Sequence, residues 1–174
     1  MTMAPGLRKF ALTAHVTSSV GWFGAVAGFL ALAVTGLVGR DAHRVQAAYL
    51  AMESIGWLVI VPLSLGSLLT GIVQALGTPW GLFRHYWVLI KLLMTVLATA
   101  LLLLHMQPIR WMSNLDAATI LSSAEVRDVR LQLVLDASAA SLVLLVATTL
   151  SVYKPRGQTR YGQRRQHPYR SDAQ

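Results

Sequence analysis

The chain has 174 residues, of which 55% are hydrophobic and only 13% are charged, and its formal net charge is +8. Soluble domains carry about 25% charged residues, so this composition excludes an ordinary water-soluble fold. The sequence contains no cysteine, which excludes disulfide bonds, thiolate catalysis, iron–sulfur clusters and thiolate metal sites.

Four apolar blocks follow one another along the chain. Thirty residues without Asp, Glu, Lys or Arg separate Lys9 from Arg40, and three comparable blocks follow. A helix needs about 20 apolar residues to cross roughly 30 Å of hydrocarbon. The first block is longer than the core of a cleaved signal peptide, so we expect it to be retained. The sequence therefore predicts an all-α fold, a four-transmembrane-helix bundle within residues 1–153, with helices near 10–38, 45–75, 83–107 and 129–153.

The first two predicted spans carry helix-specific signals. Gly21, Gly24 and Gly28 with Ser18 and Ser19 form a small-residue stripe that includes a GxxxG pair at 24–28, and such a stripe lets another helix approach closely. We expect this stripe to pack against a helix of the same chain, with a homodimer as the alternative. Pro62 lies inside the second span, where it removes a backbone hydrogen bond and predicts a kink.

The connecting segments and the C-terminal end are more polar. GTPWG (77–81) predicts a short turn between antiparallel spans, and Ser122 with Glu125 matches the S-x-x-E capping box that would start the fourth span. Residues 154–174 are basic and rich in helix breakers, which predicts a disordered tail beside the membrane. We expect this tail to contact anionic lipid headgroups, and we do not expect nucleic acid as a partner.

The distribution of Lys and Arg predicts the orientation, because cytoplasmic loops carry more of them. The N-terminus, the second loop and the tail together hold nine Lys and Arg, whereas the first and third loops hold five. Both termini are therefore expected on the cytoplasmic side of the cell membrane.

Ionisable residues inside a membrane are functional candidates, since an unpartnered charge there is costly. Depth along the helices predicts two groups, with His15 roughly 8 Å and Lys91 roughly 9–12 Å from the inner edge. The inner group is His15, Arg84, His85 and Lys91, and the outer group is Glu53, His105 and Asp136.

Structural explanations compete with functional ones for these residues. The long stem of Lys91 lets its ammonium reach toward the inner headgroups. Glu53 and Asp136 either sit protonated or pair with Arg130 or His105, and His105 is close to the outer interface.

A haem or porphyrin site is the first functional hypothesis. Neutral imidazoles inside a helical bundle are the usual axial ligands of b-type haem, and His15 and His85 lie at similar depth on different helices. Arg84 and Lys91 would then meet the haem propionates. Three tryptophans would line the flat macrocycle: Trp22, Trp57 and Trp87.

Two other hypotheses combine residues of the outer group with His15 or Lys91 of the inner group. A copper site would combine imidazole and thioether donors from His105, Met52, Met106 and Met112, and His15 and His105 are the candidate metal ligands overall. A proton-coupled transporter would use Glu53, Asp136 and Lys91 as carriers.

Three stretches resemble a bacterial family of predicted four-helix integral membrane proteins of unknown function: AHVTSSVGWFGAVAGFLAL, WGLFRHYWVLIK and LSVYKPRGQT. A more distant similarity rests on the order of scattered residues, namely His15, Trp22, Gly24, Met52, Glu53, Pro62, Gly71, Trp87, Lys91 and His105. In this order the chain is similar to the membrane protoporphyrinogen oxidase family, whose members bind haem and oxidise a porphyrinogen, and to the copper-resistance membrane-protein family. The similarity implies porphyrin or metal chemistry.

Together these observations predict an integral membrane protein associated with haem or porphyrin in a redox role, with haem b as the candidate cofactor. The alternatives are a non-catalytic membrane protein, such as a transporter subunit or accessory factor, and a copper-handling protein. Whether the protein is an enzyme stays open at this point.

Overall fold

The computed structural model describes residues 3–77 and 86–153. Four helices are long and apolar enough to cross a membrane, and the described part of the chain contains no β-strand. The all-α four-helix prediction is confirmed. The elements in chain order are α1 (Pro5–Val38), α2 (Ala42–Ile55), η1 (Gly56–Ile60), α3 (Val61–Gly77), α4 (Tyr86–Ser113), α5 (Ala117–Ser122) and α6 (Ala124–Tyr153).

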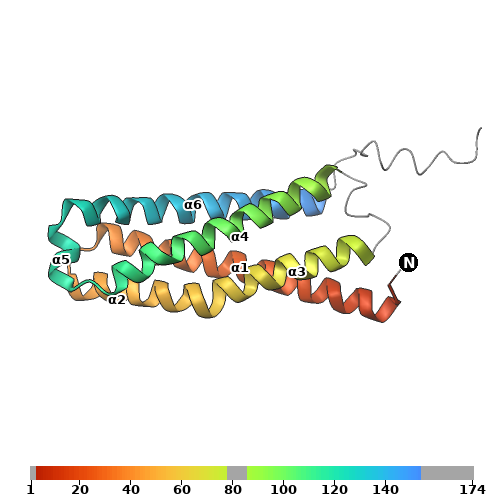
Figure 1. Ribbon diagram of the computed structural model, residues 1–174, viewed down its shortest axis with the longest axis horizontal. Coiled ribbons are helices and arrows are strands. Elements are labelled where there is room, and N and C mark those ends of the chain that lie inside the picture. The colour runs from red at the N-terminus through yellow and green to blue at the C-terminus, as the bar shows by residue number, and fades with distance from the viewer. Residues whose placement is uncertain (1–2, 78–85, 154–174) are drawn as a thin grey trace, which may run out of the picture.

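The helices lie side by side as an elongated bundle, with the short α5 closing one end (Figure 1). We call this the packed end. The opposite end, where α1 begins and α3 stops, is the cavity end. The helices extend past the predicted spans, from residue 10 back to Pro5 and from 107 on to Ser113, because hydropathy marks only the apolar part of a helix. The predicted tail, 154–174, and most of the GTPWG turn lie outside the described residues.

Pro62 is the second residue of α3, and a π-helical turn, η1, joins α2 to α3 just before it. Proline has no N–H to donate and its ring crowds the preceding turn of an α-helix. The wider π turn accommodates the proline. In it the N–H of Val61 donates to the carbonyl of Gly56, five residues back. The predicted disturbance at Pro62 is therefore a π turn within one long span, Ala42–Gly77.

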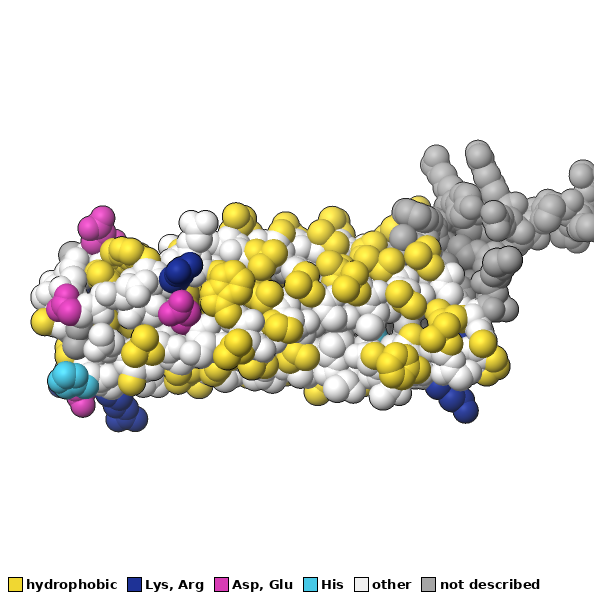
Figure 2. Space-filling view, turned by 60° about the horizontal axis from the view of Figure 1, so that its bottom comes forward, with side chains coloured by type: hydrophobic (Ala, Val, Ile, Leu, Met, Phe, Trp, Pro, Cys, Tyr) yellow, Lys and Arg dark blue, Asp and Glu magenta, His cyan; other side chains and the backbone are white. Residues whose placement is uncertain are grey.

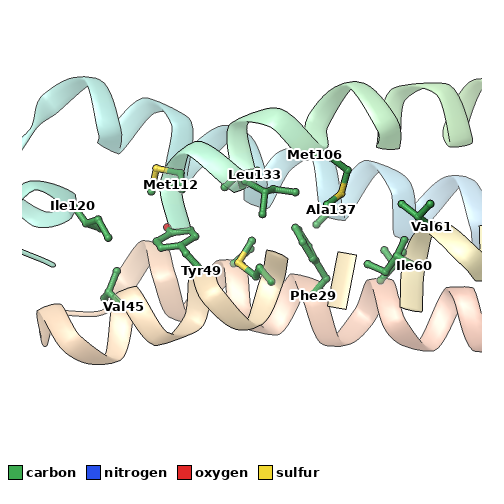
Figure 3. Close-up of a cluster of buried hydrophobic side chains, with 14 of the residues drawn as sticks. Phe29, Val45, Tyr49, Ile60, Val61, Met106, Met112, Ile120, Leu133 and Ala137 are labelled. Atoms are coloured by element: carbon green, nitrogen blue, oxygen red, sulfur yellow. The ribbon is translucent and has the colours of Figure 1, made fainter. Parts of the chain in front are cut away.

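The hydrophobic core is concentrated toward the packed end. Tyr49, Met52, Met112 and Ile120 have no exposed surface. The side chains of Tyr49, Met112 and Ile120 point into the space between the helices (Figure 3). The buried residues of α4 begin only at Thr99. Close van der Waals packing, which holds helices together in lipid, is thus best developed in this half of the bundle.

Arg130 of α6 fixes the C-terminal end of α1. The side chain is 6% exposed and donates hydrogen bonds to the carbonyl of Gly36 through Nε (2.9 Å) and Nη2, and to the carbonyl of Leu37 (2.8 Å). The last carbonyls of a helix lack partners and carry partial negative charge, so a guanidinium satisfies both needs. Arg130 therefore serves the helix end and is not the partner of Glu53 or Asp136.

The small-residue stripe of α1 packs within the chain only in part. Ser18 is buried, the Ser19 hydroxyl lies 2.7 Å from a hydroxyl of α3, and a Cβ added at Gly21 would lie 3.1 Å from Leu63. Gly24 and Gly28 have open space around them, so intramolecular packing is wrong for the GxxxG pair, which lies on the outer face of α1.

The capping box at Ser122 is also wrong. Ser122 is the last residue of α5, and its hydroxyl donates to the carbonyl of Ala118 (3.0 Å). α5 itself is capped by Asp116, whose carboxylate accepts from the backbone N–H of Thr119 (3.0 Å) and from its hydroxyl (2.6 Å). Because Ser122 belongs to this extra helix, it is not the N-cap of α6, which begins at Ala124.

Candidate binding cavity

A cavity of about 710 Å³ lies at the cavity end and is lined by all four spans. Small openings between side chains are seen in the right half of the space-filling view (Figure 2). Most of the wall is apolar, and each span contributes at least one polar residue. These include His15 from α1, Ser67 from α3, Lys91 from α4 and Ser151 from α6.

Lys91 turns into the bundle and joins three helices. Its Nζ donates to Oγ of Ser151 (2.6 Å) and lies 3.4 Å from Nε2 of His15. The hydroxyl of Ser151 already donates to the carbonyl of Ala147 (2.8 Å), so it can only accept from Lys91. The side chain is therefore held by neighbours on α6 and α1.

The hydrogen bonds of His15 define the state of its ring. Nδ1 lies 3.1 Å from the carbonyl of Ser67 and 3.2 Å from Oγ1 of Thr70. A carbonyl only accepts, so Nδ1 carries the hydrogen, and in the neutral ring Nε2 keeps a lone pair. Gly71 makes room for this ring, because a Cβ there would lie 3.1 Å from Cε1 of His15.

The charges around the cavity are of one sign. Lys91 and Arg8 contribute to the lining, and no Asp or Glu is found among the described lining residues. Nε2 of Gln74 is a further donor, since it is buried and has no hydrogen-bond partner within residues 3–77 and 86–153. An apolar cavity with unopposed donors and cations suits an anion that also carries an apolar body.

The predicted inner group is thus partly assembled. His15 and Lys91 are in contact, and Trp22 lines the same cavity while its ring is almost fully buried. Arg84 and His85 lie outside the described residues, so their placement stays a prediction. Trp57 was predicted to line the site, but its side chain is exposed and it is not a lining residue, because η1 turns it outward.

Sequence reasoning missed several members of the site. Arg8 was counted only as a topology signal, and Ser67, Gln74 and Ser151 carry no motif that separates them from other small or polar residues in spans. Only the packing of α3 and α6 against α1 and α4 brings them to Lys91.

The predicted outer group consists of two separate pairs. Glu53 accepts a hydrogen bond from the hydroxyl of Ser113 (2.5 Å), which joins α2 to α4. Asp136 pairs with His105 across α6 and α4, with Oδ2 3.0 Å from Nε2. The pairing of Asp136 with His105 is therefore the alternative that the structure adopts.

The candidate copper donors have other surroundings in the described chain. Met52, Met106 and Met112 are buried in the hydrophobic core, while His105 is turned to Asp136. No three His, Asp or Glu side chains within residues 3–77 and 86–153 are placed to hold a metal ion. The copper hypothesis gains no support from this geometry.

Comparison with models of known protein families, with characterised proteins and with solved structures found no match for the chain. The resemblances to four-helix membrane proteins, to protoporphyrinogen oxidases and to copper-resistance proteins therefore stay predictions. The cavity is the feature of the molecule that points to a function.

Proposed function

We propose that the protein binds an amphipathic anion within the membrane, with its charged group at Lys91 and its apolar body in the cavity. The observation that carries this proposal is a cavity of about 710 Å³ whose described lining holds cations and no carboxylate. Ligand sites for small molecules usually measure about 300–1,000 Å³ and have mostly apolar walls, so the volume suits a large ligand.

A haem or another porphyrin carboxylate is the ligand class to test first. Lys91 and Arg8 would meet its carboxylates, and Trp22 would contact the macrocycle. Histidines that bind metal usually donate their other ring N–H to a carbonyl or carboxylate, and His15 does so to Ser67. A bound haem would supply the redox chemistry of its iron.

One contact opposes direct ligation of iron in the observed arrangement. Nζ of Lys91 lies 3.4 Å from Nε2 of His15, the nitrogen that an iron would need. Lys91 must therefore turn away from His15 when a haem binds through this nitrogen. Binding of a metal-free porphyrin needs no such movement, which makes the two ligands separable in an experiment.

We further propose that both termini are cytoplasmic, which puts the cavity in the cytoplasmic half of the membrane. The excess of Lys and Arg in the N-terminus, second loop and tail supports this orientation. The basic residues of the tail would then contact anionic headgroups at the same surface.

At the packed end, the observed contacts support the alternative that the polar residues hold helices together and bind no ligand. The Glu53–Ser113 hydrogen bond and the 3.0 Å contact between His105 and Asp136 each join two helices, and interhelical polar contacts stabilise membrane bundles modestly. We therefore assign no ligand-binding role to these four residues.

The test is a visible absorption titration of the purified full chain in lipid nanodiscs, with haem and with metal-free protoporphyrin as separate probes. We expect saturable binding of both probes, weakened in Lys91→Met. His15→Ala should change the Soret band of bound haem and leave porphyrin binding largely intact. His43→Ala is the matched control, because His43 is exposed at the packed end. Failure of both probes to bind wild-type protein above the empty-nanodisc background would overturn the proposal.

A further inference from the structure

An amide nitrogen in the cavity wall has no partner within the described protein. Gln74 of α3 lines the cavity, and its Nε2 is buried without a hydrogen bond to any atom of residues 3–77 and 86–153. Native structures satisfy nearly all buried donors, because an unpaired one costs free energy. The amide therefore indicates an acceptor that enters the cavity with a ligand.

Helix geometry places Gln74 between Lys91 and the cavity end. Gln74 follows Gly71 by three residues, about one helical turn, and a Cβ at Gly71 would touch the ring of His15, which contacts Lys91. α3 runs toward the cavity end, so this turn leads away from Lys91 (Figure 1). Gln74 thus belongs to a second polar position, displaced from Lys91 along the bundle.

Arg8 shares this second position. It precedes His15 by seven residues on α1, and seven steps of about 100° return to nearly the same helix face. α1 begins at the cavity end, so Arg8 lies on the same side of His15 as Gln74, and both line the cavity. The wall between Arg8 and His15 contains the apolar Leu12. Lys91 at the first position and Gln74 with Arg8 at the second are thus about one to two helical turns apart, roughly 5–10 Å along the helix axes.

Both members of the second position donate hydrogen bonds. A guanidinium has only donors and stays charged, and Nε2 of an amide carries two N–H groups. An anionic acceptor satisfies both, and the described lining contains no carboxylate that would repel it. The count of cations leads to the same conclusion, since Lys91 takes one acidic group of a ligand and Arg8 remains for another.

We propose that the cavity selects an amphiphile with two acidic groups, one bound at Lys91 and one at Gln74 and Arg8, and that Gln74 determines this selection. The inference rests on the proposed function, because it names the class of anion that the same cavity takes. A monoacid of equal size leaves Nε2 of Gln74 buried and unpaired, and a site built to hydrogen-bond a group discriminates strongly against analogues that lack it. Arg8 acts from an exposed position, where water weakens its attraction, so Gln74 is the sharper determinant.

The experiment compares ligands that differ only in their number of free acids. Metal-free protoporphyrin, its monomethyl ester and its dimethyl ester are each titrated into the full chain in lipid nanodiscs, and porphyrin fluorescence is read against empty nanodiscs. We expect the dissociation constant of wild-type protein to rise at least about tenfold from the diacid to the monoester, since one charged hydrogen-bonded contact is lost. The dimethyl ester should bind more weakly still. Equal affinity for the diacid and the monoester would overturn the inference and would mean that lipid or water meets the second position.

Two variants assign the selection to its residues. Gln74→Leu keeps the size of the side chain and removes its donors, so the preference of the protein for the diacid over the monoester should shrink to about threefold or less. Arg8→Met should reduce the same preference by a smaller factor. A Gln74→Leu variant that keeps the full preference, or that weakens both ligands equally, would show that Gln74 serves the structure and does not select the ligand.

Each variant has a matched control outside the cavity lining. Gln107→Leu makes the same change at an exposed position of α4, and Lys9→Met removes the exposed cation next to Arg8. Both controls should keep the wild-type preference for the diacid.

The outcomes separate the two proposals. Saturable binding of protoporphyrin without preference over its monoester contradicts this inference and leaves the proposed function standing. Absence of any binding contradicts both. The comparison of esters on wild-type protein decides the selection for two acids even if a variant fails to fold.

Discussion

The packed end and the cavity end of the bundle satisfy their polar groups in different ways. At the packed end Arg130 is buried against carbonyl oxygens of α1, and Tyr49, Met52 and Met112 fill the surrounding space. At the cavity end Lys91 is held by Ser151 and His15 beside a cavity of about 710 Å³. The charge of Arg130 is compensated by carbonyl oxygens of the protein, whereas the described lining of the cavity beside Lys91 contains no carboxylate, and the proposed function places the anionic ligand there. Stability should therefore depend on the first residue and binding on the second.

The largest effect on stability is expected from Arg130→Met. The substitution leaves the carbonyls of Gly36 and Leu37 without their donors in a buried position, so we expect the free energy of unfolding to fall by roughly 2–4 kcal/mol. Thermal unfolding followed by far-UV circular dichroism in detergent measures the change. Arg127→Met is the control, since Arg127 lies one turn earlier on α6 and is exposed. Equal losses in both variants would show that Arg130 has no special role.

A smaller effect is expected at Gly36, where the packed end tolerates no side chain. A Cβ at this position would lie 2.6 Å from Oη of Tyr49, which is fully buried, so Gly36→Ala should destabilise the bundle by about 1–3 kcal/mol. The same thermal assay applies.

Gly24→Ala is the matched control for Gly36→Ala, because it lies on the same helix in open space. Alanine is the better helix former, so we expect this variant to be neutral or up to about 1 kcal/mol more stable. A clear loss at Gly24 would mean that another protein surface covers this face of α1 in the membrane, as the homodimer hypothesis requires.

Lys91→Met tests the cavity end and should separate binding from stability. We expect the unfolding free energy of the ligand-free protein to stay within about 1 kcal/mol of wild type, because apolar replacement of a buried ionisable group is often neutral or stabilising. Porphyrin binding should be lost or strongly weakened in the same preparation. A large loss of stability would instead support the alternative that Lys91 specifies helix packing.

The sequence predicts the spans well and the contacts between them less well. Hydropathy locates all four helices because a helix that crosses lipid needs apolar residues along its whole length. The depth of His15 and Lys91 also placed them together correctly, since both lie at similar distances from one membrane face. The facing of Gly24, Trp57 and Arg130 could not be predicted, because it depends on the rotation of each helix against its neighbours. For the same reason Ser151 could not be predicted as a member of the site, since its role depends on the contact with Lys91 of the neighbouring helix α4.

The smallest expected effect is a dependence on pH at the packed end. The hydrogen bond from the Thr119 hydroxyl, together with that from its backbone N–H, lowers the pKa of Asp116 from its ordinary value of 3.8. A lowered pKa means that the cap stabilises α5 above the unfolded value and is lost as the pH falls through the folded value. Asp116→Asn should remove this acid dependence while it keeps an acceptor for the backbone N–H of Thr119. NMR titration of the Asp116 carboxyl checks the direction, and a folded pKa at or above 3.8 would contradict the cap. The binding of porphyrin at the opposite end should not respond to this variant, because Asp116 contributes nothing to the described lining of the cavity.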